Sequence, residues 1–253
     1  MSLRACRRAV ALAFVLIKCI LRFWIMRLKG PRTLERRALW LQKSCTDVLD
    51  SLEIRHSVEG TPPQSGLVVS NHLSYLDIAV LSGAMPCFFV SKAEVDNWPF
   101  FGKAARSGGT LFIDRSSIAS AGKVAEMIGE RLRLPVPILL FPEGTSTDGS
   151  AVLRFHSRLF EPAIVAGAPI TAASIRYSLE DGTPERELCW FGDDTFFPHL
   201  VKTLRSARIS AEVRFGEART YTDRRVAADR TRDEVVAMRA TGSTVEEKSA
   251  LTI

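Results

Sequence analysis

The chain has few of the features that mark several common classes of protein. Its five cysteines are odd in number and scattered, with no C-x2-C pair, so neither a disulfide framework nor a metal site is expected. No internal repeat is present, which excludes a solenoid. No G-x-S-x-G motif occurs, so a serine nucleophile of the hydrolase type is absent. The first 40 residues contain a single acid, Glu35.

Basic residues are concentrated at the N-terminus. The net charge of the chain is +6, residues 1–40 carry +9, and the remainder is left with −3. A nucleic-acid binder would spread its cations over a folded face, so this asymmetry favours another partner. The longest charge-free run of the segment has nine residues, whereas a bilayer span needs about 20 apolar residues.

A helical wheel sorts this segment into two faces at about 100° per residue. The cations of one face are Arg4, Arg7, Lys18, Arg22 and Lys29. The apolar residues expected to face the other way are Leu12, Ala13, Leu16, Ile20 and Phe23. The pattern predicts a helix in the membrane interface, with its basic groups toward anionic lipid heads. A tilted span with snorkelling basic ends is the alternative.

Short apolar runs alternate with helical stretches along the rest of the chain. The predicted fold is α/β, with a mixed, largely parallel central sheet flanked by helices. Residues 1–53 are expected to form a membrane-associating pair of helices, 54–240 the α/β domain, and 241–253 a disordered tail. Strands are predicted at Ile54–Val58, Leu67–Val69, Phe88–Lys92, Ile170–Tyr177, Leu188–Phe191 and Ile209–Phe215. A further strand is predicted to end before Asp114-Arg115, and another to run from Ile138 into a Pro-Glu-Gly turn. Helices are predicted at 33–52, 119–133, 195–204 and 231–240.

The segment from Asn71 to Asp77 follows one of these strands and contains a histidine and an aspartate five residues apart. On one continuous helix such residues point about 140° apart, because each residue turns by about 100°. His72 and Asp77 can therefore meet only if the chain turns between them, with the aspartate near the start of the next helix. The carboxylate would then hold one imidazole nitrogen and leave the other free to act as a general base.

Polar clusters also end two further predicted strands, at Asp114-Arg115 and at Pro142-Glu143-Gly144. Such clusters meet at the carboxyl edge of an open α/β sheet. With N-H-x4-D first, G-x-x-F-I-D-R second and F-P-E-G-T third, the chain resembles the glycerolipid acyltransferases, typified by 1-acylglycerol-3-phosphate acyltransferases. Ala168-Pro169-Ile170 fits a weaker fourth block, and the resemblance covers roughly residues 58–215.

The resemblance implies direct transfer of an acyl group, without an acyl-enzyme, from acyl-CoA or acyl carrier protein to a lysolipid hydroxyl. His72 would be the general base and Asp77 its partner. The implied substrate-binding residues are Asn71, Arg115, Glu143, Gly144, Thr145 and Ser146. No cofactor is expected, since the acyl donor is itself a substrate. No metal or nucleic acid is expected either, because of the scattered cysteines and the charge distribution described above. The protein is expected at the cytoplasmic face of the inner or plasma membrane, as a peripheral or monotopic protein.

Ser146 departs from the pattern, because members of the family that use glycerophosphates usually have arginine there, in E-G-T-R. Serine cannot supply the charge or the bidentate fork that suit a phosphate. Arg115 remains as a ligand, and Arg154 or Arg158 could substitute. The expected acceptor is 1-acylglycerol-3-phosphate. The alternatives are a lyso-ornithine lipid, whose head carries a carboxylate and an amine, and, in another class, a noncatalytic lipid-binding protein at the membrane surface.

Overall fold

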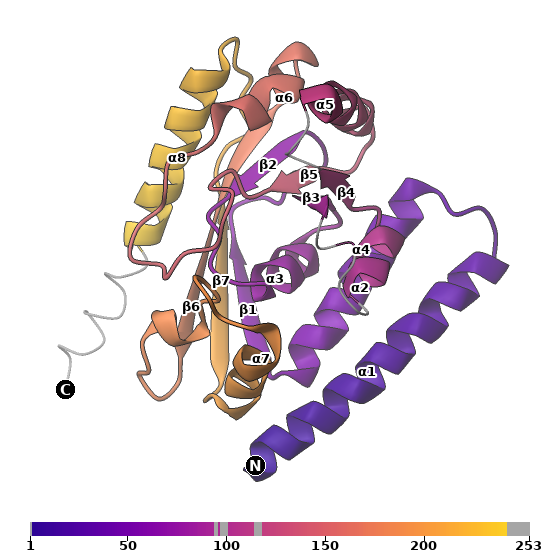
Figure 1. Ribbon diagram of the computed structural model, residues 1–253, viewed down its shortest axis with the longest axis vertical. Helices are drawn as coiled ribbons and strands as arrows, with labels where there is room; N and C mark the ends of the chain where they lie inside the picture. The colour runs from indigo at the N-terminus through magenta and orange to yellow at the C-terminus, as the bar shows by residue number, and fades with distance from the viewer. Residues whose placement is uncertain (1, 94–95, 97–100, 114–117, 242–253) are drawn as a thin grey trace.

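The structure, a computed structural model, describes residues 2–93, 96, 101–113 and 118–241 (Figure 1). Seven strands form one sheet in the order β1-β7-β6-β2-β5-β3-β4. The five strands from β6 to β4 are parallel to one another, and β7 joins β6 antiparallel and β1 parallel. Their bounds are β1 Ile54–Glu59, β2 Leu67–Ser70, β3 Phe88–Lys92, β4 Leu111–Ile113, β5 Ile138–Leu140, β6 Ile170–Leu179 and β7 Ile209–Phe215. The predicted mixed, largely parallel sheet is confirmed.

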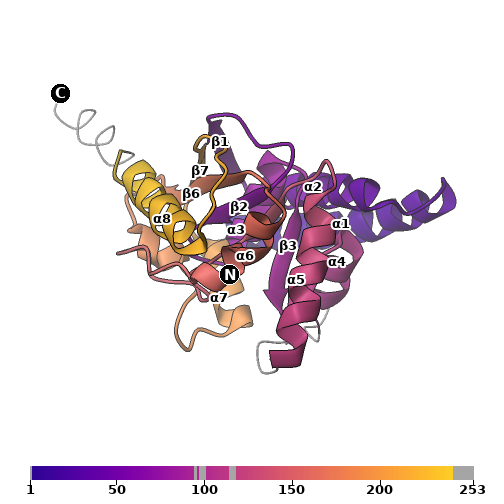
Figure 2. The ribbon, with the colours of Figure 1, turned by 90° about the horizontal axis from the view of Figure 1, so that it is seen from above.

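The sheet is covered by helices on both faces, because its central strands are apolar on both sides. In β2, Val68 belongs to one core cluster while Leu67 and Val69 belong to the other, as strand alternation requires. Helices α2 (Leu34–Ser51), α3 (Leu76–Ala84), α4 (Phe101–Gly108) and α7 (Phe196–Arg205) lie on one side, and α5 (Ile118–Leu132), α6 (Glu161–Val165) and α8 (Arg224–Thr241) on the other (Figures 1 and 2). The result is a three-layer α/β/α arrangement.

The N-terminal helix α1 (Leu3–Leu28) runs antiparallel to α2 along the outside of this body (Figure 1). Phe23 packs edge-on against Trp40 of α2, with ring centroids 5.2 Å apart, and the Trp40 indole N–H donates to Cys19 O at 3.1 Å. Arg8 is only 1% exposed, and its guanidinium binds carbonyl oxygens at the end of α7, including Ser206 O at 2.9 Å. The predicted pair of helices is therefore attached to the body along its length.

The predicted faces of α1 need correction. Of the predicted apolar face, Leu12 and Phe23 pack against the core of the protein, whereas Leu16 and Ile20 are exposed. Lys18 and Arg22, expected to face lipid, both bind Asp47 of α2, at 3.2 and 2.6 Å. The exposed apolar residues form a third face, opposite the body, that includes Val10, Phe14, Ile17, Leu21, Trp24 and Leu28. By length and composition α1 could cross a membrane, the single helix among the described residues of which this holds.

Two further sequence predictions differ from the structure. Leu188–Phe191 is not a strand, because a 3-10 helix ends at Leu188 and the chain then continues without regular structure. The neighbouring strand β6 pairs with β7 on one side. Beyond Ala173, where its pairing with β2 ends, the side chains of Asn71 and Glu185 bond the backbone of its other edge. Helix α8 begins at Arg224, seven residues before the predicted start at Thr231. The predicted tail beyond Thr241 lies outside the described residues.

Candidate active site

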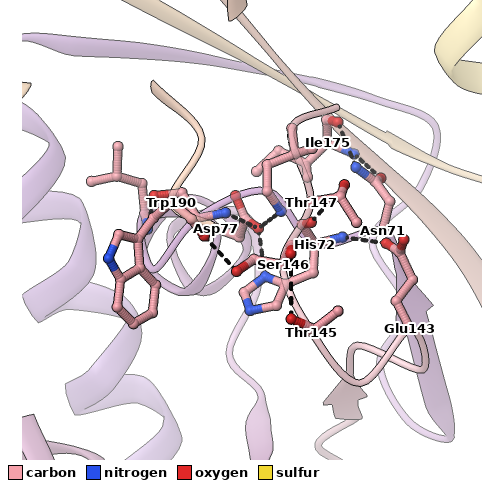
Figure 3. Close-up of polar contacts among 12 residues, drawn as sticks. Asn71, His72, Asp77, Glu143, Thr145, Ser146, Thr147, Ile175 and Trp190 are labelled. Atoms are coloured by element: carbon pink, nitrogen blue, oxygen red, sulfur yellow. Dashed lines mark hydrogen bonds and ion pairs between the residues drawn. The ribbon is translucent and has the colours of Figure 1, made fainter. Parts of the chain in front are cut away.

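His72 and Asp77 meet at the carboxyl end of β2, through the turn that their spacing requires. His72 lies in the loop after the strand, and Asp77 is in the first turn of α3. The His72 Nδ1 and Asp77 Oδ2 atoms are 2.7 Å apart (Figure 3). Because an ionised carboxylate only accepts, Nδ1 carries the proton and Nε2 holds the lone pair. The histidine side chain is 19% exposed, and among the described residues no hydrogen-bond partner faces Nε2.

The carboxylate of Asp77 is fully buried and bonded on both oxygens. Oδ2 also accepts the backbone N–H groups of Leu73 at 2.6 Å and Ser74 at 3.0 Å, while Oδ1 accepts the hydroxyl of Tyr177 at 2.7 Å. A buried charge is tolerated only when it is bonded in this way. The N-terminal end of α3 further favours the negative charge. Asp77 is therefore held as an anion whose orientation fixes the imidazole.

The imidazole ring of His72 is also held from the side. It stacks on the ring of Phe141, with centroids 4.0 Å apart and planes 11° from parallel. Phe141 follows β5, which pairs with β2, so the third sequence block lies directly beside the first. Stacking confines ring rotation about the hydrogen bond to Asp77 and directs Nε2 outward. The sequence blocks contained Phe141, but nothing in their pattern indicated this contact.

Glu143 binds the backbone around the histidine and is 4% exposed. Its Oε1 accepts the N–H of His72 at 2.8 Å, and its Oε2 accepts the N–H of Leu153 at 2.7 Å (Figure 3). Burial raises the pKa of this carboxyl, although the two backbone hydrogen bonds act in the opposite direction. Gly144 completes the turn at a φ of 77°, a conformation that favours glycine. Glu143 therefore braces the histidine loop.

Ser146 links the third block to a loop that the sequence analysis did not include in the site. Its hydroxyl donates to the carbonyl oxygen of Trp190, while the Trp190 N–H donates to Leu73 O at 2.8 Å. The N–H of Thr147 donates to His72 O at 2.9 Å. Three loops, after β2, after β5 and around Trp190, are thus joined by hydrogen bonds around His72 (Figure 3). The side chain of Thr145 is exposed beside them.

The remaining predicted site residues differ in their burial and in their contacts. Asn71 is 1% exposed, and its amide exchanges hydrogen bonds of 3.1 and 2.9 Å with the backbone of Ile175. Contact of Asn71 or Glu143 with an acceptor is therefore not supported, since both side chains are buried and bonded to backbone groups. Arg115 lies outside the described residues. Arg154 and Arg158 are exposed on the segment after the third block.

The described residues contain no cluster of three or more side chains that could hold a metal ion. All five cysteines are free, and burial raises the pKa of Cys45, Cys87 and Cys189 to about 12 each, so these thiols stay protonated. The chemistry that the site offers is thus removal of a proton by an oriented imidazole.

Comparison with known proteins bears directly on this chemistry. A family model described as Acyltransferase matches residues 54–176. A lyso-ornithine lipid O-acyltransferase from Pseudomonas aeruginosa is 38% identical over 178 residues, which cover 70% of this chain and 67% of that protein. The chain belongs to the acyltransferase family. The resemblance inferred from the three sequence blocks is therefore confirmed, and the protein is an O-acyltransferase.

Two other members of the acyltransferase family from bacteria show the range of this similarity. A lyso-ornithine lipid O-acyltransferase from Rhodobacter capsulatus is 40% identical, over 66% of this chain and 62% of its own length. A 1-acyl-sn-glycerol-3-phosphate acyltransferase from Neisseria gonorrhoeae is 33% identical, over 65% of this chain and 68% of its own length.

The fold is also that of a solved acyltransferase. The crystal structure of a 1-acyl-sn-glycerophosphate acyltransferase from Thermotoga maritima superposes with a TM-score of 0.63. The superposition covers 94% of this chain and 98% of the other, at 17% sequence identity. At that identity the comparison supports the fold alone.

Proposed function

We propose that this acyltransferase moves a fatty acyl group from a thioester, acyl-CoA or acyl carrier protein, to the hydroxyl of a lysolipid. The observation that carries the proposal is the His72–Asp77 pair, with an imidazole nitrogen that is free and accessible at the carboxyl edge of the sheet. Of the protein's four histidines, His72 is the one bonded to a buried carboxylate among the residues that the structure describes. No cofactor takes part in the proposed reaction.

The proposed mechanism is direct transfer. His72 Nε2 takes the proton of the acceptor hydroxyl as that oxygen attacks the thioester carbonyl carbon. The tetrahedral intermediate then collapses, the carbon–sulfur bond breaks, and the imidazolium returns its proton to the leaving thiolate. Asp77 stays ionised and stabilises the imidazolium between these two steps. General-base assistance of this kind contributes roughly 10²–10⁴-fold.

We propose a lyso-ornithine lipid as the natural acceptor. Position 146, where glycerophosphate-using members usually have arginine, carries a serine whose hydroxyl is bonded to Trp190 O, so no guanidinium is present there. The similarity to lyso-ornithine lipid O-acyltransferases, at 38% and 40% identity, supports the same choice. The second candidate is 1-acylglycerol-3-phosphate, which the 33% identical relative supports. In that case Arg115, which lies outside the described residues, is the cation expected to bind its phosphate, and the exposed Arg154 or Arg158 could substitute for it.

A competition assay distinguishes the two acceptors. Wild-type protein in detergent receives labelled acyl-CoA or acyl carrier protein with equal amounts of lyso-ornithine lipid and 1-acylglycerol-3-phosphate. We expect the wild type to acylate lyso-ornithine lipid in preference. Ser146→Arg should raise the share of acylated 1-acylglycerol-3-phosphate in the product ratio by about 10-fold or more, which is the effect of one charge-assisted hydrogen bond. Ser150→Arg, exposed in the same loop, is the control and should leave the ratio unchanged.

The outcomes of this assay are separable. Preference of the wild type for 1-acylglycerol-3-phosphate would establish the second candidate. Equal ratios for wild type and Ser146→Arg would mean that position 146 does not face the head group. If neither lysolipid is acylated from either donor, the proposed reaction itself is wrong.

We also propose that the protein binds the cytoplasmic face of a membrane through the outward apolar face of α1. The opposite face of the helix is packed against the body from Ala5 to Met26, which favours a helix lying in the interface over one that crosses the bilayer alone. Ile17→Glu, at a site 57% exposed on the outward face, should move protein from the membrane to the soluble fraction. Val165→Glu, 79% exposed on α6, is the matched control. Equal membrane fractions of both variants would contradict the proposal.

A further inference from the structure

The two oxygens of the Asp77 carboxylate are bonded to very different groups. Oδ2 is shared by the imidazole of His72 and two backbone N–H groups, all from the same loop. Oδ1 has one hydrogen-bond partner among the described residues, the hydroxyl of Tyr177 at 2.7 Å. This partner comes from the C-terminal part of β6, 100 residues further along the chain. The carboxylate thus joins the histidine loop to a central strand of the sheet.

The Tyr177 side chain has no freedom to turn away. It is 2% exposed, and its strand pairs with β7 there, with Ala211 opposite Tyr177 itself. Its backbone N–H donates to Glu185 Oε1 at 2.7 Å. Burial and the negative charge of Asp77 raise the pKa of Tyr177 well above its ordinary value. The hydroxyl therefore stays protonated and can only donate to Asp77.

We infer that Tyr177 is a positioning residue that sets the proton affinity of His72 by holding and partly neutralising the Asp77 carboxylate. The inference rests on the proposed role of His72 as general base. Tyr177 does not contact the substrate, since it lies behind Asp77 in the core. Its effect passes along the row of hydrogen bonds from the tyrosine hydroxyl through the carboxylate to Nδ1 of the imidazole.

The sign of the effect follows from the hydrogen bond that would be lost. Without the hydroxyl, Oδ1 is buried and unpaired, and the negative charge is stabilised through Oδ2 alone. The carboxylate then attracts the Nδ1 proton of His72 more strongly, which favours the charged imidazolium over the neutral base. The pH above which His72 is neutral, and so able to accept a proton, must rise.

Other ionisable groups lie around the pair and stay unchanged in the test. Among the described residues, the titratable and charged groups that face Asp77, Tyr177 or His72 from neighbouring elements are Glu143, Glu185, Cys189 and, bonded to Glu185, Arg239. None of them donates a hydrogen bond to Asp77 Oδ1. These groups are the same in the wild type and in the variant. A shift in the acidic limb of the pH profile between the two proteins can therefore be assigned to loss of the Tyr177 hydroxyl.

Tyr177→Phe removes the hydroxyl and keeps the ring that fills the core. We expect kcat to fall roughly 10-fold, KM to stay within about twofold, and the acidic limb of the kcat/KM profile to move up by about 0.5 pH unit or more. Tyr75→Phe removes another tyrosine hydroxyl, of a half-buried side chain that contacts His199 at 3.1 Å, and should leave the limb in place. An unmoved limb in Tyr177→Phe, with normal thermal unfolding, would overturn the inference.

A double-variant comparison shows whether Tyr177 acts through Asp77. In an Asp77→Asn background, Tyr177→Phe should cause no further shift of the limb, because the carboxylate that transmits it is gone. Additive effects of the two substitutions would mean that Tyr177 has only a packing role.

A measurement without substrate separates this inference from the proposed function. The imidazole ¹⁵N shifts of His72, assigned by their loss in His72→Ala, are titrated in wild type and in Tyr177→Phe. The midpoint for His72 should be higher in the variant. If that midpoint rises while the protein acylates neither lysolipid, the proposed function fails and the inference stands. If the protein is active and the midpoint is unchanged, only the inference fails.

Discussion

The catalytic edge of the sheet and the N-terminal helix pair hold their charged residues in opposite ways. At the edge, Asp77 and Glu143 are buried, and every carboxylate oxygen accepts a hydrogen bond from a defined donor. In the helix pair, most ion pairs are partly exposed. Arg7 binds Glu53 with 68% of its side chain accessible, and Lys18 binds Asp47 with 48% accessible. Exposed pairs contribute about 0–1 kcal/mol each, so they orient α1 more than they stabilise it.

The difference explains why one region was easier to interpret from sequence. At the edge, His72 and Asp77 are five residues apart, and the turn that joins them is local. In the helix pair, the partners of the cations are 25 to 46 residues away. A local pattern determines a local geometry, whereas a run of cations does not identify the carboxylates that will neutralise it. Among the cations of the helix pair, Arg8 differs in being as deeply buried as Asp77 and Glu143.

The largest expected effect is at the edge. His72→Ala should lower kcat by roughly 10²–10⁴-fold because the general base is lost. Asp77→Asn should also lower kcat strongly, since an amide cannot orient and stabilise the imidazole as a carboxylate does. His56→Ala on β1 is the control and should retain activity. Turnover of His72→Ala within about threefold of wild type, with the fold intact, would falsify the general-base role.

The second largest effect is expected at Arg8, the buried cation of the N-terminal helix pair. Arg8→Met removes the guanidinium that binds carbonyl oxygens of Thr203, Leu204, Ser206 and Ala207 and the carboxylate of Glu53. We expect unfolding free energy to fall by about 2–3 kcal/mol, because buried acceptors lose their donor. Arg7→Met, at an exposed site that also binds Glu53, should cost less than about 1 kcal/mol. Denaturant midpoints of the two variants give the comparison. Equal losses would mean that Arg8 acts only as a surface ion pair.

The contrast between local patterns and distant partners also determines which strands could be predicted from sequence alone. Strands such as β2 and β5 were predictable because a strand buried on both faces is a short, continuous apolar run. The segment Leu188–Phe191 is equally apolar, yet it is no strand. Leu188 and Cys189 fill the core, and the backbone of the neighbouring strand β6 is bonded there by the side chains of Asn71 and Glu185. Burial was visible in the sequence, but the availability of a pairing partner was not.

The candidate site shows a similar limit. The sequence blocks brought His72, Asp77 and Glu143 to one edge, where the structure also places them. The sequence blocks gave no indication of Tyr177, which lies outside all of them and whose partner Asp77 is 100 residues away. Nor did they show that Glu143 and Asn71 bind backbone groups, because a motif records which residue types are needed and not what they touch.

A smaller effect is expected from the carboxylate that braces the histidine loop. Glu143→Gln leaves one of the N–H groups of His72 and Leu153 without an acceptor, since the amide nitrogen cannot accept. We expect a loss of about 1–2 kcal/mol in unfolding free energy and a fall in kcat with KM little changed. Glu161→Gln, half exposed in α6, is the control. A large rise in KM for the lysolipid with unchanged stability would instead restore Glu143 as an acceptor ligand.

The smallest effect is expected at His199 of α7, on the pH dependence of the unfolding free energy. His199 of α7 is 4% exposed and sits between Tyr75 of the histidine loop and the backbone of Cys189, with contacts of 3.1 Å to both. Burial lowers the pKa of His199 below its ordinary value of 6.5. Its unfolded form therefore binds a proton at a higher pH than its folded form, so stability falls as pH drops through 6.5 toward the lowered value.

His199→Gln should remove this part of the pH dependence while keeping one donor and one acceptor in place. We expect the loss of unfolding free energy between about pH 7.5 and pH 5.5 to be smaller in the variant, by less than about 1 kcal/mol. Exposed His156→Gln should retain the wild-type loss. Denaturant midpoints at the two pH values measure the difference. If His199→Gln loses as much stability as wild type, proton binding by His199 does not contribute, and acid sensitivity must come from the carboxylates of the edge or of the helix pair.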